Sequence, residues 1–165
     1  MNDFSDLFFT MFSIVIFSML LLQANQAIFQ NNVVMVDHEY EKTAISLAQS
    51  LIDEARKTAY DEAVLDGDVP QNVNPGDVFS PNSELGPPAG VTRPDFTVFD
   101  YYNGYTDTIH TDLGPFVMNV TVNYVIGDPP YGQSGEQTFS KLLEAEVRSL
   151  HADRSVRLNY LKTYF

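Results

Sequence analysis

Residues 4–22 read FSDLFFTMFSIVIFSMLLL, and this stretch decides how the rest of the chain is organised. Its uncharged part, from Leu7 to Leu22, is 16 residues long and mixes large apolar residues with a few hydroxyl residues. A helix that spans a bilayer needs about 20 predominantly apolar residues, with about 17 as the lower limit. Extension through Phe29 supplies the missing length. Residues 1–32 are therefore predicted to form one hydrophobic helix, suited to a membrane or to the core of an assembly.

The flanks of this stretch carry acidic residues and no basic ones. Asp3 and Asp6 stand at its start, and the first basic residue of the chain is Lys42. A secretory signal peptide normally begins with basic residues, and a single-pass anchor is normally oriented by them. The pattern therefore indicates either a segment whose basic leader has been removed or a segment that ends up packed against protein.

Between Val33 and Leu65 the hydrophobic pattern changes to that of an amphipathic helix. Apolar residues recur at steps of three and four, and charged residues occupy the opposite face. No Pro or Gly occurs before Gly67, so one helix through residues 1–65 is permitted, with Asn31-Asn32 as its weakest point. The alanine-rich stripe is predicted to pack against a sheet through Leu47, Ala48, Leu51, Ile52, Ala55 and Ala59.

Residues 66–94 are rich in Pro, Gly, Asn and Asp, a composition that predicts a loop. Gly67 and Pro70 are predicted to end the preceding helix. Several oxygen-bearing side chains could hold calcium, but the closing Glu of an EF-hand is absent. Ordinary turn chemistry is the preferred interpretation, so no metal site is predicted. The oxygen-bearing residues in question are Asp66, Asp68, Asn72, Asn74 and Asp77.

Residues 95–165 are predicted to consist mainly of β-strands. Residues 116–126 alternate between apolar and polar side chains, as a half-buried strand does. Residues 139–150 are ambiguous: their composition favours a helix, whereas alternation places Lys141, Leu143, Ala145, Val147 and Ser149 on one face. We interpret them as a strand, followed by a hairpin loop and a last strand over residues 155–165.

Shorter strands are predicted at residues 96–100 and 106–110, on either side of an Asn103-Gly104 turn. The predicted fold is therefore α+β, with a long N-terminal helix packed on a C-terminal antiparallel sheet. Residues 33–165 are expected to form one globular head.

The composition excludes several classes of function. The absence of cysteine excludes disulfides, thiolate metal sites and a cysteine nucleophile. With 9 basic and 22 acidic residues the net charge is −13, which argues against nucleic-acid binding. The three histidines lie far apart and no nucleotide-binding or hydrolase motif occurs, so neither enzyme activity nor a cofactor is predicted. Asn119-Val-Thr121 matches a glycosylation sequon.

The order of these elements resembles that of type IV pilins and pseudopilins over the whole chain. FTVFDYYNGY at residues 96–105 resembles the D-Y-N-G turn of bacterial pilin-like proteins. KLLEAEVRS followed by SVRLNYLKTYF resembles their closing hairpin. The missing basic flank is similar to that of mature pilins, whose basic leader is removed by a peptidase. The chain departs from the pattern at Met1, where mature pilins usually carry Phe, and at Ser5, where they carry Glu.

The resemblance implies a structural subunit of an extracellular type IV pilus-like filament. Such a subunit is first inserted in the inner membrane, meets the pilus assembly machinery, and then polymerises with copies of itself. Apolar side chains that leave water in the polymer contribute roughly 1.5–3 kcal/mol each. The implied filament core consists of Phe4, Leu7, Phe8, Phe9, Met11, Phe12, Ile14, Val15, Ile16, Phe17, Met19, Leu20, Leu21 and Leu22.

Asp3 and Asp6 are the predicted assembly residues. A lone carboxylate in an apolar core is costly unless it is paired. Our hypothesis is that one of them pairs with the N-terminal amine of a neighbouring subunit and sets the register. The competing interpretation leaves both in water at the membrane boundary. The alternative function is a monomeric, single-pass accessory protein or minor pseudopilin that binds a partner through its β domain.

Overall fold

The structure is a computed structural model that describes residues 3–65, 67, 74–152 and 154–164. The chain divides into two compact units, Met1–Glu39 and Tyr40–Phe165, so the boundary lies beyond the predicted one at residues 32–33. Helix α1 (Asp3–Ala55) begins in the first unit and ends in the second. It continues through Asn31 and Asn32 without a break in its helical backbone.

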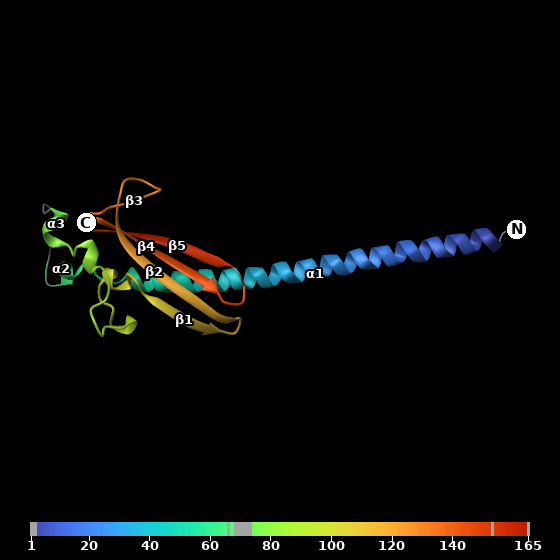
Figure 1. The fold of residues 1–165 in the computed structure, drawn as a ribbon, viewed down its shortest axis with the longest axis horizontal. Coiled ribbons are helices and arrows are strands. Elements are labelled where there is room, and N and C mark those ends of the chain that lie inside the picture. Colours follow the sequence, from blue (N-terminus) through green and yellow to red (C-terminus); the bar gives the residue numbers. More distant parts are fainter. Residues whose placement is uncertain (1–2, 66, 68–73, 153, 165) are drawn as a thin grey trace. The chain divides into compact units, whose positions relative to one another are not determined.

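An antiparallel sheet forms the other half of the second unit (Figure 1). Its strand order is β1-β2-β4-β5, and β3 pairs with the end of β2. The three alternating segments predicted as strands are confirmed. They include residues 139–150, whose composition favoured a helix and which form β4. The strands are β1 (Thr106–Thr111), β2 (Gly114–Ile126), β3 (Gly132–Gln133), β4 (Ser140–Ser149) and β5 (Ser155–Thr163).

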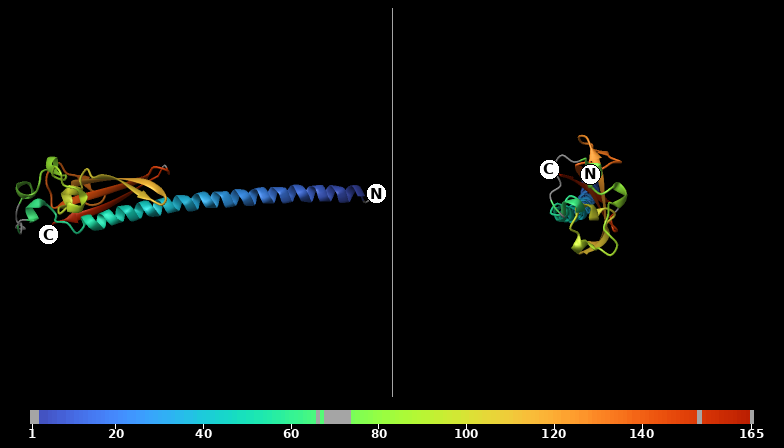
Figure 2. Two further views of the ribbon diagram at one scale, coloured as in Figure 1. Left: turned by 90° about the horizontal axis from the view of Figure 1, so that it is seen from below. Right: turned by 90° about the vertical axis from the view of Figure 1, so that its left-hand side faces the viewer.

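The core lies between the C-terminal part of α1 and one face of this sheet (Figure 2). Small residues on the helix, among them Ala44 and Ala48, meet large residues on β2 and β4 such as Phe116 and Leu143. Small side chains let the helix axis approach the strands closely, and the large ones fill the space between. The predicted α+β fold, with the helix packed on the sheet, is thus confirmed.

Substitution of Ala48 by leucine tests this close approach. The Ala48 side chain has 0% exposure, so three extra carbons must displace neighbours in a filled core. We expect the free energy of unfolding to fall by about 1–3 kcal/mol, measured by denaturant titration of the full chain in detergent. Gln49→Leu, on the exposed face of the same helix, should change it by less than about 0.5 kcal/mol. Equal effects of the two substitutions would contradict the packing described here.

The predicted helix over residues 33–65 is wrong beyond Ala55. The chain turns there, and the Ala59 N–H donates to the Thr97 carbonyl at 2.9 Å while the Phe99 N–H donates to the Ala59 carbonyl at 2.8 Å. Ala59 therefore forms a bridge with Val98 and does not lie on the helix stripe. Backbone pairing across the fold outweighs the local helix propensity, which returns only in the short α2 (Glu62–Leu65).

The region between α2 and β1 contains short helical turns. These are α3 (Pro75–Val78), η1 (Asn82–Glu84), η2 (Arg93–Asp95) and η3 (Phe99–Tyr102). The strand predicted at residues 96–100 is wrong, because η3 turns the chain so that Phe99 and Tyr102 enter the core. Gly104 has φ 75°, which suits the predicted turn. Asp66, Asp68 and Asn72, considered above as calcium ligands, lie outside the described residues.

Candidate functional site

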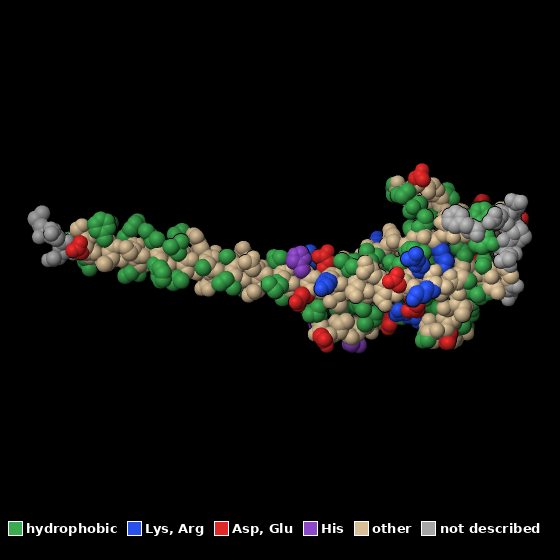
Figure 3. Space-filling model, turned by 180° about the vertical axis from the view of Figure 1, so that it is seen from behind, with side chains coloured by type: hydrophobic (Ala, Val, Ile, Leu, Met, Phe, Trp, Pro, Cys, Tyr) green, Lys and Arg blue, Asp and Glu red, His purple; other side chains and the backbone are tan. Residues whose placement is uncertain are grey.

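The first unit presents a continuous apolar surface. No charged residue occurs between Asp6 and Asp37. All fourteen residues of the implied filament core are exposed, with exposed fractions between 44% and 83%. The visible face of this segment in Figure 3 carries hydrophobic side chains and no lysine or arginine. The helix is long and apolar enough to cross a membrane, with a mean hydropathy of 2.2 over its most apolar stretch.

The hydroxyl groups within this surface are satisfied by the helix itself. Thr10 donates to the Leu7 carbonyl at 2.8 Å, Ser13 to that of Phe9 at 2.8 Å, and Ser18 to that of Ile14 at 2.8 Å. Side-chain hydroxyls bonded in this way need no water. The segment therefore demands no outside hydrogen-bond partner over its first half, as an apolar environment requires.

Of the two predicted assembly residues, Asp3 and Asp6, the structure describes the side chain of Asp6 alone. Asp6 is exposed on the first turns of α1. The side chain of Asp3 lies outside the described residues. The hypothesis that one of them pairs with a neighbouring subunit stays a prediction.

The helix stripe and the sequon residue occupy different surroundings. Leu47, Ala48, Leu51, Ile52 and Ala55 all belong to the core or pack against it. The sequon residue Asn119 is exposed on β2, where its Oδ1 accepts a hydrogen bond from the Thr106 hydroxyl at 3.1 Å.

A buried ionic cluster, formed by Lys141, Asp61 and Asp100, lies at the end of the sheet. Their exposed fractions are 0%, 1% and 3%. The Lys141 Nζ is 2.8 Å from Asp61 Oδ2, and 2.7 and 2.8 Å from Asp100 Oδ1 and Oδ2. Lys141 also donates to the Tyr60 carbonyl at 3.1 Å. Strand β4 places the lysine, η3 places Asp100, and the turn after Ala59 places Asp61.

The two carboxylates of this cluster differ in their hydrogen bonding. Asp61 accepts from the backbone N–H groups of Ala63 at 3.2 Å and Ser80 at 3.0 Å, as well as from the Ser80 hydroxyl at 3.2 Å. Among the described residues Asp100 has no such partner, and its Oδ1 is buried without a hydrogen bond of suitable geometry. One carboxylate is therefore held in a network, whereas the other depends mainly on the lysine.

Their pKa values differ accordingly. Burial raises the pKa of Asp100 from its usual 3.8 to about 7, although the Lys141 ammonium opposes this. Burial also acts to raise the pKa of Asp61, but Lys141 and the backbone hydrogen bonds outweigh it and hold that pKa below the usual value. The cluster thus pairs an ionised carboxylate with one that is readily protonated near neutral pH.

The sequence carried one signal for this cluster. Alternation placed Lys141 on the same face as Leu143, Ala145 and Val147, and that face is the buried one. A lysine on an apolar strand face needs an acidic partner, because buried charges are paired. Which two of the 22 acidic residues supply it depends on the turns around Asp61 and Asp100, and these have no periodic pattern.

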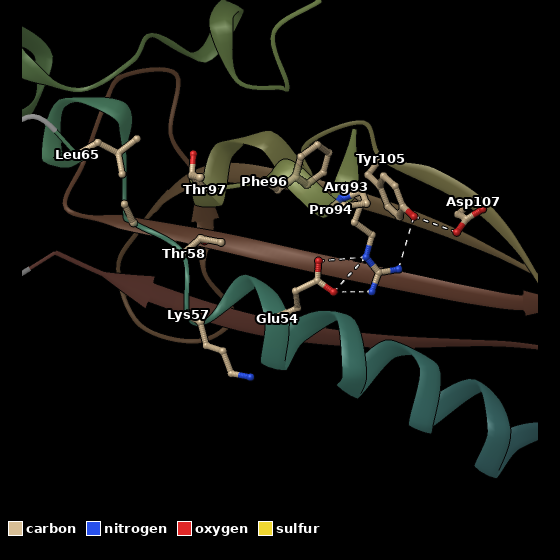
Figure 4. A pocket seen from close by; sticks show the side chains of 11 residues that line it. Glu54, Lys57, Thr58, Leu65, Arg93, Pro94, Phe96, Thr97, Tyr105 and Asp107 are labelled. Atoms are coloured by element: carbon tan, nitrogen blue, oxygen red, sulfur yellow. Dashed lines mark hydrogen bonds and ion pairs between the residues drawn. The ribbon is translucent and has the colours of Figure 1, made fainter. Parts of the chain in front are cut away.

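A second polar group lines an open depression beside α1 (Figure 4). The Arg93 guanidinium reaches back to Glu54, with Nη2 2.8 Å from Oε2, and its Nη1 donates to the Tyr105 hydroxyl at 3.5 Å. Tyr105 in turn donates to Asp107 at 2.9 Å. The hydrogen bonds from Arg93 lower the pKa of Glu54. Each group already has a partner within the chain, so the arrangement acts as a clamp between α1, η2 and β1.

Lys162 on β5 donates hydrogen bonds to carbonyl groups at and just after the C-terminal end of α1. Its Nζ donates to the carbonyls of Ala55 at 3.4 Å, Arg56 at 3.3 Å, and Thr58. The last turn of α1 has no basic residue of its own, and a helix C-terminus favours a cation. Burial, with a smaller contribution from the charge of Lys141, lowers the pKa of Lys162 from 10.5 to about 8.

This lowered pKa predicts a pH dependence of stability. Between about pH 8 and 10.5 the unfolded chain keeps the Lys162 proton and the folded chain loses it, so stability rises with pH. The amine is only half-buried, so we expect a rise of about 1–2 kcal/mol in the unfolding free energy of the wild type relative to Lys162→Met. Denaturant titrations of both chains across this range measure it, since other groups titrate equally in each. Parallel pH curves for the two chains would refute the assignment.

No family model, curated protein or solved structure matches the chain. Within the described part of the chain, no three His, Asp or Glu side chains are grouped so that they could hold a metal ion. The site must therefore be interpreted from its own geometry: an exposed apolar helix in one unit, and a buried ionic cluster in the other.

Proposed function

We propose that the chain is a structural subunit of an extracellular type IV pilus-like filament, polymerised through the apolar half of α1. The observation that carries this proposal is the exposure of all fourteen large apolar residues of that segment. Monomeric soluble proteins rarely expose contiguous apolar patches above a few hundred Å². Lipid or other protein must therefore cover this one, and the proposed subunit meets lipid of the inner membrane first and copies of itself afterwards.

The composition of the segment supports a final environment made of protein. Its uncharged part, from Leu7 to Val36, extends over roughly 45 Å as a helix, whereas the hydrocarbon core of a bilayer is roughly 30 Å thick. The second half of this part contains side-chain amides at Gln23, Asn25, Gln26 and Gln30. Such amides are unfavourable in lipid but can bond with one another between packed helices.

The resemblance of the element order to pilins points in the same direction, and the confirmed fold class agrees with it. The role proposed is structural, with no turnover of a substrate assigned to the head. The alternative is a monomer anchored by a single span, which the length and hydropathy of α1 would equally allow.

Microscopy of sheared surface material separates these two functions. Cells that make the full chain are sheared, the released material is pelleted, and the pellet is imaged by negative stain and analysed by mass spectrometry. The proposal expects thin fibres with this chain as their main component, and their loss when the gene is deleted. Recovery of the chain only from the membrane fraction would favour the anchored monomer.

A further inference from the structure

The buried ionic cluster is arranged for a covalent step that the proposed filament function does not require. We propose that the Lys141 Nζ and the Asp100 carboxyl carbon form an intramolecular isopeptide bond, with Asp61 accepting a proton from the amine. The bond would join β4 to η3 across the head. The geometry around the three side chains carries this assignment.

The Lys141 amine lies almost equally far from the two carboxyl oxygens of Asp100. Its distances to the two oxygens, 2.7 Å to Oδ1 and 2.8 Å to Oδ2, are nearly equal, which directs the nitrogen at the carbon between them. That carbon is bonded to both oxygens and so also lies close to the nitrogen, and closeness of the reacting atoms favours attack. Asp61 touches the amine through Oδ2 alone, at 2.8 Å. Asp100 is thus placed as the electrophile and Asp61 as the base.

The hydrogen bonds assign the same roles. Both oxygens of Asp61 accept from Ser80, which favours the charged form that can take up a proton. Asp100 lacks such donors within the described part of the chain, so its carboxyl group is readily protonated, in agreement with its raised pKa of about 7. A protonated acid can lose its hydroxyl as water, whereas a carboxylate resists attack by an amine.

The surroundings favour condensation. The Nζ lies 4.3 Å from the centre of the Tyr60 ring and 4.8 Å from that of Tyr124, with Phe79 at 5.9 Å. With all three ionic residues at most 3% exposed, bulk water is excluded from the reacting atoms. Condensation releases water, so a site from which bulk water is excluded favours the amide over hydrolysis.

The step balances without any further reagent. The Lys141 ammonium gives one proton to the Asp61 carboxylate, and its lone pair then attacks the Asp100 carbonyl carbon to form the new C–N bond. The tetrahedral intermediate expels the hydroxyl group, which takes the second amine proton and leaves as water. The products are a neutral amide, one water molecule, and a protonated Asp61 that can hydrogen-bond to the new carbonyl.

Lys162 provides a matched control within the same head. Its amine is also partly buried, but the oxygens to which it donates are the backbone carbonyls of Ala55, Arg56 and Thr58. A peptide carbonyl is a much poorer electrophile than a protonated acid. Lys162 is therefore expected to keep a free amine.

Intact-mass measurement of the purified full chain tests the proposal. The wild type is expected to weigh one water less than its sequence, and proteolysis followed by tandem mass spectrometry should find a branched peptide joining Lys141 to Asp100. Lys141→Arg should restore the full mass, whereas Lys162→Arg should retain the deficit. Asp61→Asn should slow formation of the bond at least tenfold during incubation at neutral pH.

Two results would overturn the proposal. One is a wild type that keeps the full mass after prolonged incubation at neutral pH, a result that does not depend on any variant folding. The other is a deficit located elsewhere, above all at Asp66-Gly67, where succinimide formation also releases one water. Hydroxylamine cleaves a succinimide and leaves an isopeptide bond intact, so the two sources are distinguishable.

Discussion

Replacement of Ile14 by lysine is expected to remove the chain from sedimentable filaments and to lower its membrane-bound fraction at least about tenfold. Ile14 lies in the middle of the stretch from Leu7 to Leu22 and is 65% exposed in its unit, so its surroundings are supplied by lipid or by other subunits. A lysine at the centre of a membrane helix costs about 3–4 kcal/mol relative to isoleucine. Between packed apolar helices the lysine side chain cannot extend to the bilayer surface, so its charge stays buried without a partner.

Ile126→Lys is the matched control for this experiment. Ile126 is an isoleucine of similar exposure, 57%, at the end of β2 in the second unit. A lysine there remains in water, so filament yield should be unchanged within about twofold. Both variants are quantified by immunoblot of the sheared pellet, the membrane fraction and the soluble fraction. Normal filaments from Ile14→Lys, or equal loss in both variants, would contradict the proposed role of the segment.

Lys141→Met is expected to cause the largest loss of stability in the second unit. The substitution leaves Asp61 and Asp100 buried and within reach of each other without a cation. Removal of one partner from a buried ionic group typically costs about 3–5 kcal/mol. Denaturant titration of the full chain in detergent measures this loss. Lys162→Met, at the half-buried lysine, should cost clearly less.

A triple variant tests whether the stability loss of Lys141→Met comes from uncompensated buried charge or from lost packing. Lys141→Met combined with Asp61→Asn and Asp100→Asn leaves no charge in the cluster, while the amide oxygen introduced by Asp61→Asn can still accept from the Ser80 N–H. Such variants often recover stability, because replacement of a whole buried ion pair is close to neutral. We expect the triple variant to regain at least half of the loss. A triple variant as unstable as Lys141→Met would show that side-chain shape or the lost bond between Lys141 and Asp100, and not uncompensated charge, dominates there.

Much of the fold follows from local pattern. The helix through residues 3–55 could be predicted because the first 66 residues of the chain contain neither Gly nor Pro and because its apolar spacing is helical. Strand β2 could be predicted because its side chains alternate, and Phe116, Met118, Val120 and Val122 are all buried. The same alternation outweighed helical composition in β4. Each of these elements packs against a surface that needs only to be apolar. The sequence of the element alone was therefore enough to predict it.

The remaining features depend on distant partners. The end of α1 at Ala55 reflects the pairing of Ala59 with Val98 and the contact of Lys162 with the last carbonyls. Residues 96–100 favour a strand by composition, but η3 forms there because it places Phe99 and Tyr102 in the core. The acidic partners of Lys141 are 80 and 41 residues away in the chain. No periodic signal in one segment can report such pairings.

Cysteine cross-linking within the apolar segment tests the central claim most directly. The chain has no cysteine, so a single Ile14→Cys or Phe17→Cys introduces the only thiol. In sheared fibres, treatment with a short bifunctional thiol reagent should yield covalent dimers of this chain, because neighbouring helices pack about 8–10 Å apart. Ile126→Cys in the same fibres should remain largely monomeric. Uncross-linked monomers at both apolar positions, or cross-links that appear equally in dilute detergent, would contradict a filament built through this helix.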